Sequence, residues 1–329
     1  MILVTGATGH IGNVLVRQLL EKGEQVRALI WRGEDTRSLR DLEVETIEGD
    51  VLDLSSLWEA FQGVRGVFHL AGMISIMPGR DSTIWRVNVE GTKNVIKAAI
   101  ESGVKRLVYT SSIHAIRRME RGIIDETLPY DLETPYGEYD RSKAAATLEV
   151  QKAAQAGLDA VIVCPTGVIG PYDFRDSEIG HVIRGAALAH PTLYVDGAYD
   201  FVDVRDVAQG LILAEQTGLA GESYIFSGHK ISVRYLLETV REVTGRAFTS
   251  IKLPFGLAAF VAKFAPHYYR IAQTKPRFTP YSLEVLRSNA DISHAKASRE
   301  LGYQTRSMYE TITDTVRWIL ENRSALGKV

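Results

Sequence analysis

Two side chains that can exchange a proton, Tyr139 and Lys143, stand four positions apart in the stretch "YDRSK". The continuation "KAAATLEVQKAAQA" is rich in alanine and predicts a helix, in which positions i and i+4 share one face. An ammonium beside a phenol favours the phenolate, so we expect Lys143 to lower the pKa of Tyr139 toward physiological pH. Such a tyrosine suits acid–base catalysis. The plain alternative is a solvated lysine beside a packed tyrosine.

A pair of hydroxyl side chains, Ser111 and Ser112, ends the apolar run "RLVYTSS". The run predicts a strand, and ligands of open α/β sheets bind at the carboxyl ends of the strands. We therefore expect one of the two hydroxyls at a ligand site, the alternatives being a helix cap or a loop hydroxyl. His114 follows two residues after Ser112 and either touches the substrate or lies in a loop.

A third candidate is the glycine-rich stretch "VTGATGHIGNVL" at 4–15, with Gly6, Gly9 and Gly12 between a predicted strand and a predicted helix. Glycines at this place let backbone N–H groups at a helix amino end approach a pyrophosphate. A tight strand-to-helix turn selects glycine as well. This stretch alone therefore leaves two interpretations open.

The elements that must position these residues alternate between short apolar runs and amphipathic stretches. Strands are predicted at 2–5, 25–30, 44–47, 66–70, 106–110 and 159–164, and helices at 12–22 and 88–102. This order predicts an α/β fold with a doubly wound parallel sheet of the Rossmann type over 1–165. A smaller mixed C-terminal lobe with sparse strands, 166–329, is expected to bind the substrate, with segments near 200–228 returning to the first lobe.

Composition limits the partners. The 38 basic and 40 acidic residues give a net charge of −2, which gives no reason to expect nucleic acid or an anionic membrane. The single cysteine, Cys164, indicates a reducing compartment, and we expect a soluble, cytoplasmic protein that binds a small molecule and no metal. The apolar stretch 255–264 is too short to span a bilayer and predicts a core helix or a substrate lid, with membrane contact as the remaining alternative.

Taken together and in this order, the motifs resemble the extended short-chain dehydrogenase/reductase family, also called the NAD-dependent epimerase/dehydratase family. Nearly the whole chain takes part in this resemblance. The combination is most similar to the dihydroflavonol reductase-like branch. The motifs that carry it are "TGATGHIG", "GDVLD" at 49–53, "HLAG" at 69–72, "NVEGTKNV" at 88–95, "YTSS", "YDRSK", "CPTGVIGP" at 164–171 and "FVDVRDVA" at 201–208.

The resemblance implies a role for each matching residue. Ser112 orients a carbonyl group, Tyr139 is the general acid or base, and Lys143 binds the nicotinamide ribose. Asn88 holds the geometry of the active-site helix, and helices near 88–102 and 138–156 form a homodimer. The cofactor-binding positions are Gly6, Gly9, His10, Ile11, Gly12, Arg32, Asp50, Val51, Leu70, Ala71, Gly72, Tyr139, Lys143, Pro165, Gly167 and Val168.

The choice between NADP and NAD depends on the residues after the second predicted strand. An acid about 20 residues after the glycine loop binds the ribose hydroxyls and disfavours a 2′-phosphate. Here Arg32 precedes the first acids, Glu34 and Asp35, so the sequence favours NADP, with NAD left open. Reductases of the dihydroflavonol type carry their arginine where this chain has Trp31. In the alternative, Arg32 points into solvent.

The substrate class follows from one departure from the family pattern. Members that act on sugar nucleotides place an arginine where this chain has Tyr199, although Arg205 or Arg175 could replace that clamp. We predict an oxidoreductase that transfers a hydride between nicotinamide and a ketone or secondary alcohol of a small ring-bearing substrate. Aromatic residues of the second lobe could line a flat apolar pocket, although most of them are expected in the core: Tyr172, Phe174, Tyr194, Phe255, Phe260, Phe264, Tyr268 and Tyr269.

Two other functions stay open at this point. One is a sugar-nucleotide epimerase or dehydratase, in which the cofactor is reduced only transiently. The other is a non-catalytic NAD(P)-sensing regulator. Such regulators typically lack the Tyr and Lys pair, which this chain retains as Tyr139 and Lys143.

Overall fold

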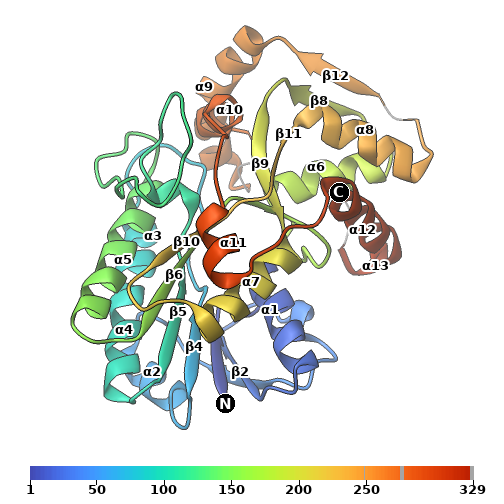
Figure 1. The fold of residues 1–329 in the computed structure, drawn as a ribbon. Coiled ribbons are helices and arrows are strands. Elements are labelled where there is room, and N and C mark those ends of the chain that lie inside the picture. The colour runs from blue at the N-terminus through green and yellow to red at the C-terminus, as the bar shows by residue number, and fades with distance from the viewer. Residues whose placement is uncertain (248, 275–277, 327–329) are drawn as a thin grey trace.

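A seven-stranded parallel sheet forms the centre of the first lobe in the computed structural model, which describes residues 1–247, 249–274 and 278–326 (Figure 1). Its strand order, β10-β6-β5-β4-β1-β2-β3, reverses direction at β1, as in doubly wound folds. The predicted α/β fold class is confirmed. The strands are β1 (Ile2–Thr5), β2 (Val26–Ile30), β3 (Glu45–Glu48), β4 (Gly66–His69), β5 (Arg106–Thr110), β6 (Ala160–Pro165) and β10 (Ser223–Phe226).

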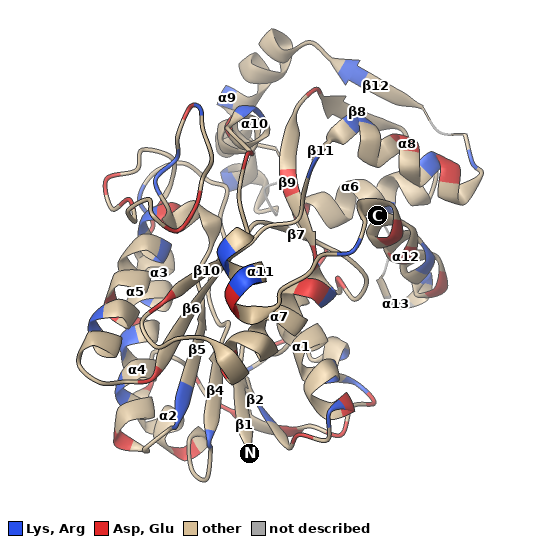
Figure 2. Cartoon of the chain, viewed as in Figure 1, with Lys and Arg blue, Asp and Glu red and all other residues tan. Residues whose placement is uncertain are grey.

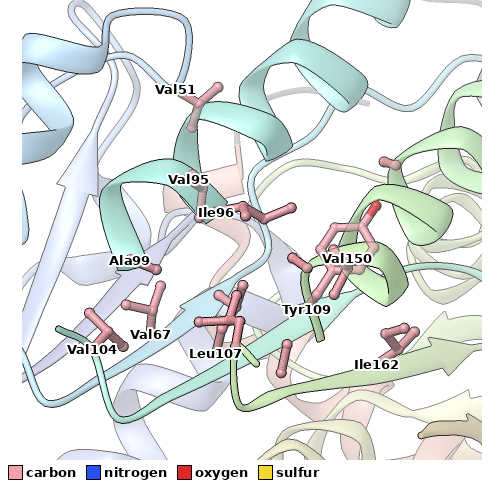
Figure 3. Close-up of a cluster of buried hydrophobic side chains, with 14 of the residues drawn as sticks. Val51, Val67, Val95, Ile96, Ala99, Val104, Leu107, Tyr109, Val150 and Ile162 are labelled. Carbon is pink, nitrogen blue, oxygen red and sulfur yellow. The ribbon is translucent and has the colours of Figure 1, made fainter. Parts of the chain in front are cut away.

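Helices cover both faces of this sheet, so its central strands are apolar on both sides. In β5, Leu107 and Tyr109 pack toward one face and Val108 toward the other. Figure 3 shows Leu107 and Ile162 of the sheet facing Val95 and Val150 of the covering helices. One face carries α2 (Leu54–Ala60), α4 (Gly91–Glu101) and α5 (Glu138–Gln155), and the other carries α1 (His10–Glu21), α7 (Val204–Thr217) and α11 (Ala295–Leu301).

The predicted strands agree with the observed ones to within one residue at each end. The predicted helix at 88–102 differs more, because α3 (Ser82–Trp85), a π-helical turn (Arg86–Glu90) and α4 follow one another there. A π turn changes the spacing of the apolar positions, so a pattern based on 3.6 residues per turn places the start of the helix too late.

The second lobe holds two small sheets and the remaining helices. The expectation of sparse strands is wrong. In the described part of the chain, six strands follow Thr166, and each is only three to six residues long. Runs this short carry little alternation. Besides β10, they are β7 (Gly167–Ile169), β8 (Thr192–Val195), β9 (Ala198–Asp203), β11 (His229–Ser232) and β12 (Ser250–Leu253).

The helices of this lobe surround those sheets, and the order β11-β9-β7 forms one sheet while β12 pairs with β8. The segment around 200–228 supplies α7 and β10 to the first lobe, where β10 pairs in parallel with β6. Among the described residues, no helix is long and apolar enough to cross a bilayer. The helices are α6 (Glu178–Ala187), α8 (Val233–Thr244), α9 (Phe255–Ala272), α10 (Pro280–Arg287), α12 (Met308–Glu321) and α13 (Arg323–Leu326).

Candidate active site

The residues expected to form the site follow the carboxyl ends of adjacent strands. Because parallel strands end at the same edge of a sheet, the fold gathers these residues along one edge. Gly6, Gly9, His10, Ile11 and Gly12 follow β1, Arg32 follows β2, Asp50 and Val51 follow β3, Leu70, Ala71 and Gly72 follow β4, Ser112 follows β5, and Pro165, Gly167 and Val168 lie at the end of β6 and in β7.

The glycine turn at Gly6–Gly12 has features of a tight strand-to-helix turn and also of a pyrophosphate-binding loop. Gly6 has a φ of +70°, and a Cβ there would lie 2.7 Å from the backbone of Ala71. A Cβ on Gly12 would lie 2.1 Å from the carbonyl oxygen of Gly6, so the turn itself requires both glycines. The amino end of α1 is nevertheless open, because no side chain of the described residues caps it at Gly9. An uncapped amino end beside a glycine turn fits a pyrophosphate.

The neighbouring part of the edge, after β4 and β5, fits the nicotinamide half of a dinucleotide whose pyrophosphate lies at the glycine turn. A Cβ on Gly72 would lie 3.1 Å from Asn88 Oδ1 and 3.7 Å from Lys143 Nζ, so glycine keeps the approach to Lys143 open. Thr110 Oγ1 is buried and has no hydrogen-bond partner among the described residues. A buried hydroxyl without a partner next to a lysine suits a polar ligand.

Ser112, Tyr139 and Lys143 come together at the start of α5, all buried to more than nine-tenths of their surface. The Ser112 hydroxyl lies near enough to the Tyr139 phenol to lower the pKa of that phenol. Ser111 instead pairs with Thr147 Oγ1 at 2.6 Å, which joins the end of β5 to α5. The structure thus places Ser112, and not Ser111, beside the tyrosine.

The expectation that Lys143 lowers the pKa of Tyr139 is wrong for the chain by itself. Burial raises the pKa of Tyr139 to about 12, and the nearby Ser112 hydroxyl offsets only part of that effect. Burial also lowers the pKa of Lys143 to about 8, and its Nζ donates to the Thr110 carbonyl oxygen at 2.8 Å. Tyr139 therefore keeps its proton at neutral pH, which is the form that a proton donor needs.

Asn88 connects the loop after β4 to α5 from within the π-helical turn. Its side chain accepts from the Met73 N–H at 2.7 Å and donates to the Met73 carbonyl at 3.0 Å. It also donates to Ser142 Oγ at 2.9 Å, one position before Lys143. Asn88 is thus positioned to hold α5 against this loop.

A buried charged pair behind Tyr139 was missed by the sequence analysis. Asp140 is fully buried and accepts from Arg118 at 2.9 Å and from the Tyr281 hydroxyl at 2.8 Å. Tyr281 lies in α10, 141 positions further along the chain, so no local pattern could connect the two. Only the position of Asp140, directly after Tyr139 in a predicted helix, hinted at a role.

His114 connects the Asp140–Arg118 pair to the rings of Tyr199 and Tyr281. We call these three rings the aromatic wall. Its ring lies 6.2 Å from the Tyr139 ring and stacks on the Tyr199 ring at 6.1 Å, centroid to centroid. Arg118 can only donate, so Nδ1 of His114, at 3.2 Å, accepts and the ring proton is on Nε2, facing the Tyr199 hydroxyl at 3.4 Å. Burial lowers the pKa of His114 to about 4, so the ring is neutral at pH 7.

The aromatic residues predicted for the pocket are mostly elsewhere. Tyr172 and Phe174 pack against Trp318, and Phe260 and Phe264 on α9 are exposed to solvent. The rings near Tyr139 belong instead to Tyr199, Tyr281 and His114. Aromatic content alone does not report which rings the fold turns toward the site.

Arg32 and Glu34, the residues that bear on the cofactor's 2′-position, have different surroundings. The Arg32 side chain is 86% exposed and pairs with Glu48 at 2.7 Å. Glu34 instead accepts from Thr8 of the glycine turn at 2.6 Å and from Arg175 of the second lobe. Glu34, the first acidic residue after β2, therefore contacts the glycine turn and forms an ion pair with Arg175.

Known proteins resemble this chain along nearly its whole length. The family model of the NAD dependent epimerase/dehydratase family matches residues 2–226. "Sterol demethylase protein B" of Methylococcus capsulatus is 36% identical over 97% of this chain and 98% of that protein. A Synechocystis sp. protein that carries a dihydroflavonol 4-reductase name is 33% identical, over 96% and 93%. The crystal structure of gox2253 superposes with a TM-score of 0.84 at 32% identity and covers 98% of both chains.

The match of the family model and the geometry of the sheet edge lead to the same assignment. The glycine turn meets an open helix end, and a protonated tyrosine lies beside a serine with a lysine one helical turn away. The chain belongs to the NAD-dependent epimerase/dehydratase family, the extended short-chain dehydrogenases/reductases, and is an NAD(P)-dependent oxidoreductase of that type.

Proposed function

We propose that this protein interconverts a ketone and a secondary alcohol on an uncharged, ring-bearing substrate with NADP(H). The observation that carries the proposal is the buried Tyr139, which keeps its proton, with the Ser112 hydroxyl near it. When bound, nicotinamide supplies the hydride. Ser112 holds the carbonyl oxygen, and Tyr139 gives that oxygen its phenolic proton, so that hydride and proton together yield the alcohol. Lys143 binds the nicotinamide ribose and stabilises the phenolate that remains.

The surroundings of Tyr139 support an uncharged ring as substrate. The rings of His114, Tyr199 and Tyr281 offer flat apolar faces. Arg118, the cation beside these rings, is paired with buried Asp140, and of its buried nitrogens only Nη1 lacks a partner among the described residues. It therefore offers a diphosphate less than an unpaired cation does. The relatives' names, which refer to a sterol and a dihydroflavonol, agree with such a substrate.

Two ion pairs support NADP(H) as the cofactor. Arg32 pairs with Glu48 on the surface, and an exposed pair of this kind contributes only ~0–1 kcal/mol, so a 2′-phosphate can take the place of Glu48. Glu34 is neutralised by Arg175 and therefore repels a phosphate less than a free carboxylate does. We assign Arg32 to the 2′-phosphate on this basis.

The function is tested by nicotinamide absorbance during turnover, with NADPH and NADH in parallel. Ring-bearing ketones and a set of sugar nucleotides serve as substrates, with product analysis for each. We expect net oxidation of NADPH by a ring-bearing ketone. An isomerised or dehydrated sugar nucleotide without net change in nicotinamide identifies an epimerase or dehydratase instead. Cofactor binding without turnover of any substrate identifies a sensing protein.

The cofactor assignment is tested by Arg32→Ala. We expect the KM for NADPH to rise about tenfold and the KM for NADH to stay unchanged, because only the 2′-phosphate loses its cation. Arg234→Ala is the matched control, since Arg234 forms a similar exposed pair with Glu238 in the second lobe. Equal changes for both cofactors, or none, contradict the role of Arg32.

A further inference from the structure

Helix α9 has its large apolar side chains on the outside. The positions that it buries against its own lobe are small or compact: Ala258, Ala262 and Pro266. Its outward residues recur at helical spacing and form one stripe, with 51–72% of each side chain's surface exposed. We call these six residues the α9 stripe: Leu257, Phe260, Val261, Phe264, Tyr268 and Ile271. A soluble chain seldom exposes so many large apolar residues together without a partner for them.

The charges of α9 lie beside this stripe and have a single sign. Lys263, His267 and Arg270 follow at spacings of four and three, so they share one flank, and the helix contains no Asp or Glu. The neighbouring strand β12 adds exposed Ile251, and also Lys252, whose charge is paired with that of Asp196. Figure 2 shows basic positions on α9 and β12, at the end of the molecule away from the seven-stranded sheet. The chain's net charge of −2 therefore conceals a local basic surface.

We propose that α9 docks on a lipid bilayer with anionic headgroups. The α9 stripe enters the boundary between headgroups and acyl chains, while Lys263 and Arg270 extend to the phosphates, an arrangement that suits an amphipathic helix lying in the plane of the surface. A second copy of the chain fits less well, because a two-fold contact sets the cations of one α9 against those of the other without a carboxylate from either helix. The resemblance also assigns the homodimer contact to other helices, α4 and α5.

A short path joins this surface to the active site. Leu283 of α10 packs on Ala258 and Ala262 of α9. At the start of α10, Thr279 Oγ1 donates to the carbonyl of Ile76 at 2.7 Å and the Tyr281 hydroxyl donates to Asp140. Ile76 belongs to the loop after β4, which also exposes Ile74 at 71%. Docking of α9 does not depend on the proposed reaction. The delivery of a lipophilic ketone from the bilayer to Tyr139 rests on it.

The test is flotation of the full chain with vesicles of phosphatidylcholine alone and of phosphatidylcholine mixed with phosphatidylglycerol. We expect the protein to float with the mixed vesicles and to be released by salt, because screening weakens the attraction of Lys263 and Arg270 to the headgroups. The double variant Phe260→Ser/Phe264→Ser loses more than about tenfold in partition coefficient. Lys263→Gln/Arg270→Gln loses about fivefold for each cation, on the mixed vesicles only.

Leu219→Ser is the matched control, since Leu219 is 59% exposed and lies after α7, in the first lobe. It is expected to float like the unmodified chain, and circular dichroism checks that every variant is folded. The proposal is overturned if the unmodified chain stays in solution with both kinds of vesicle. It is also overturned if the Phe260→Ser/Phe264→Ser variant floats as well as the unmodified chain. Sedimentation velocity detects the competing occupant: a change of oligomeric state in that variant, without vesicle binding by the unmodified chain, assigns the α9 stripe to a second copy.

Discussion

The carboxyl edge of the large sheet and helix α9 are opposite exceptions to the usual distribution of residues. At the sheet edge, Asp140 and Lys143 are buried charged groups, whereas on α9, Phe264 is a large apolar side chain with 61% of its surface exposed. Charged residues are seldom fully buried, and extended apolar patches are seldom exposed. The buried charges have partners within the chain, as Arg118 and Tyr281 are for Asp140. The part of the second lobe that the structure describes leaves the α9 stripe uncovered, so the two regions require partners of different kinds.

The largest effect that sharpens this comparison is expected from Tyr139→Phe. Removal of the phenolic hydroxyl takes away the proton donor and leaves the ring, so turnover falls by ~10²–10⁴ while the affinity for NADPH is unchanged. Single-turnover kinetics and cofactor titration by fluorescence measure the two quantities. Phe264→Ser, in the α9 stripe, is the control and keeps its turnover with a water-soluble ketone. Unchanged turnover in Tyr139→Phe removes this residue from the mechanism.

The next effect is on stability and concerns the buried pair. Asp140→Ala leaves Arg118 buried without its counter-ion, and we expect the free energy of unfolding to fall by about 3–5 kcal/mol. Urea denaturation measures it. Asp140→Asn keeps the volume and an acceptor for Tyr281, so its loss is smaller. A loss of stability in Asp140→Ala no greater than in an exposed variant would mean that the pair is solvated.

Acid is expected to destabilise the site end of the molecule through His114. Its pKa is lowered by burial from 6.5 to about 4, so the unfolded chain binds more protons between these values. The contribution of His114, roughly 3 kcal/mol, is therefore present above pH 6.5 and is lost as the pH falls toward 4. In urea denaturation as a function of pH, His114→Gln flattens this decline. His229→Gln, which changes an exposed histidine, leaves it as steep as before.

The smallest effect is expected from Phe264→Ser. Because the ring is mostly in solvent, its loss changes the free energy of unfolding by less than about 0.5 kcal/mol, measured in the same urea titration. A substitution that leaves stability untouched while it abolishes flotation with vesicles separates docking from folding. Destabilisation by more than about 2 kcal/mol would instead show that the ring packs against the protein, as buried rings do.

Much of the first lobe was predictable because its signals are local. Short apolar runs located six of the strands of the sheet, and the glycine turn and "YDRSK" named candidate site residues that the fold places at its carboxyl edge. The π-helical turn at Arg86–Glu90 and the partner of Asp140 were not predictable. The first departs from the ordinary helical period, and the second depends on a residue from another lobe.

The sequence by itself determined the order of the strands in the first lobe, the family, and a set of candidate site residues, since these depend on residue types at fixed spacing. Only the tertiary structure decided that Tyr139 keeps its proton, because desolvation depends on everything that packs around the phenol. It also decided that α9 turns its small residues inward and its large apolar ones outward. Which face of an apolar helix is exposed depends on which face the rest of the lobe packs against.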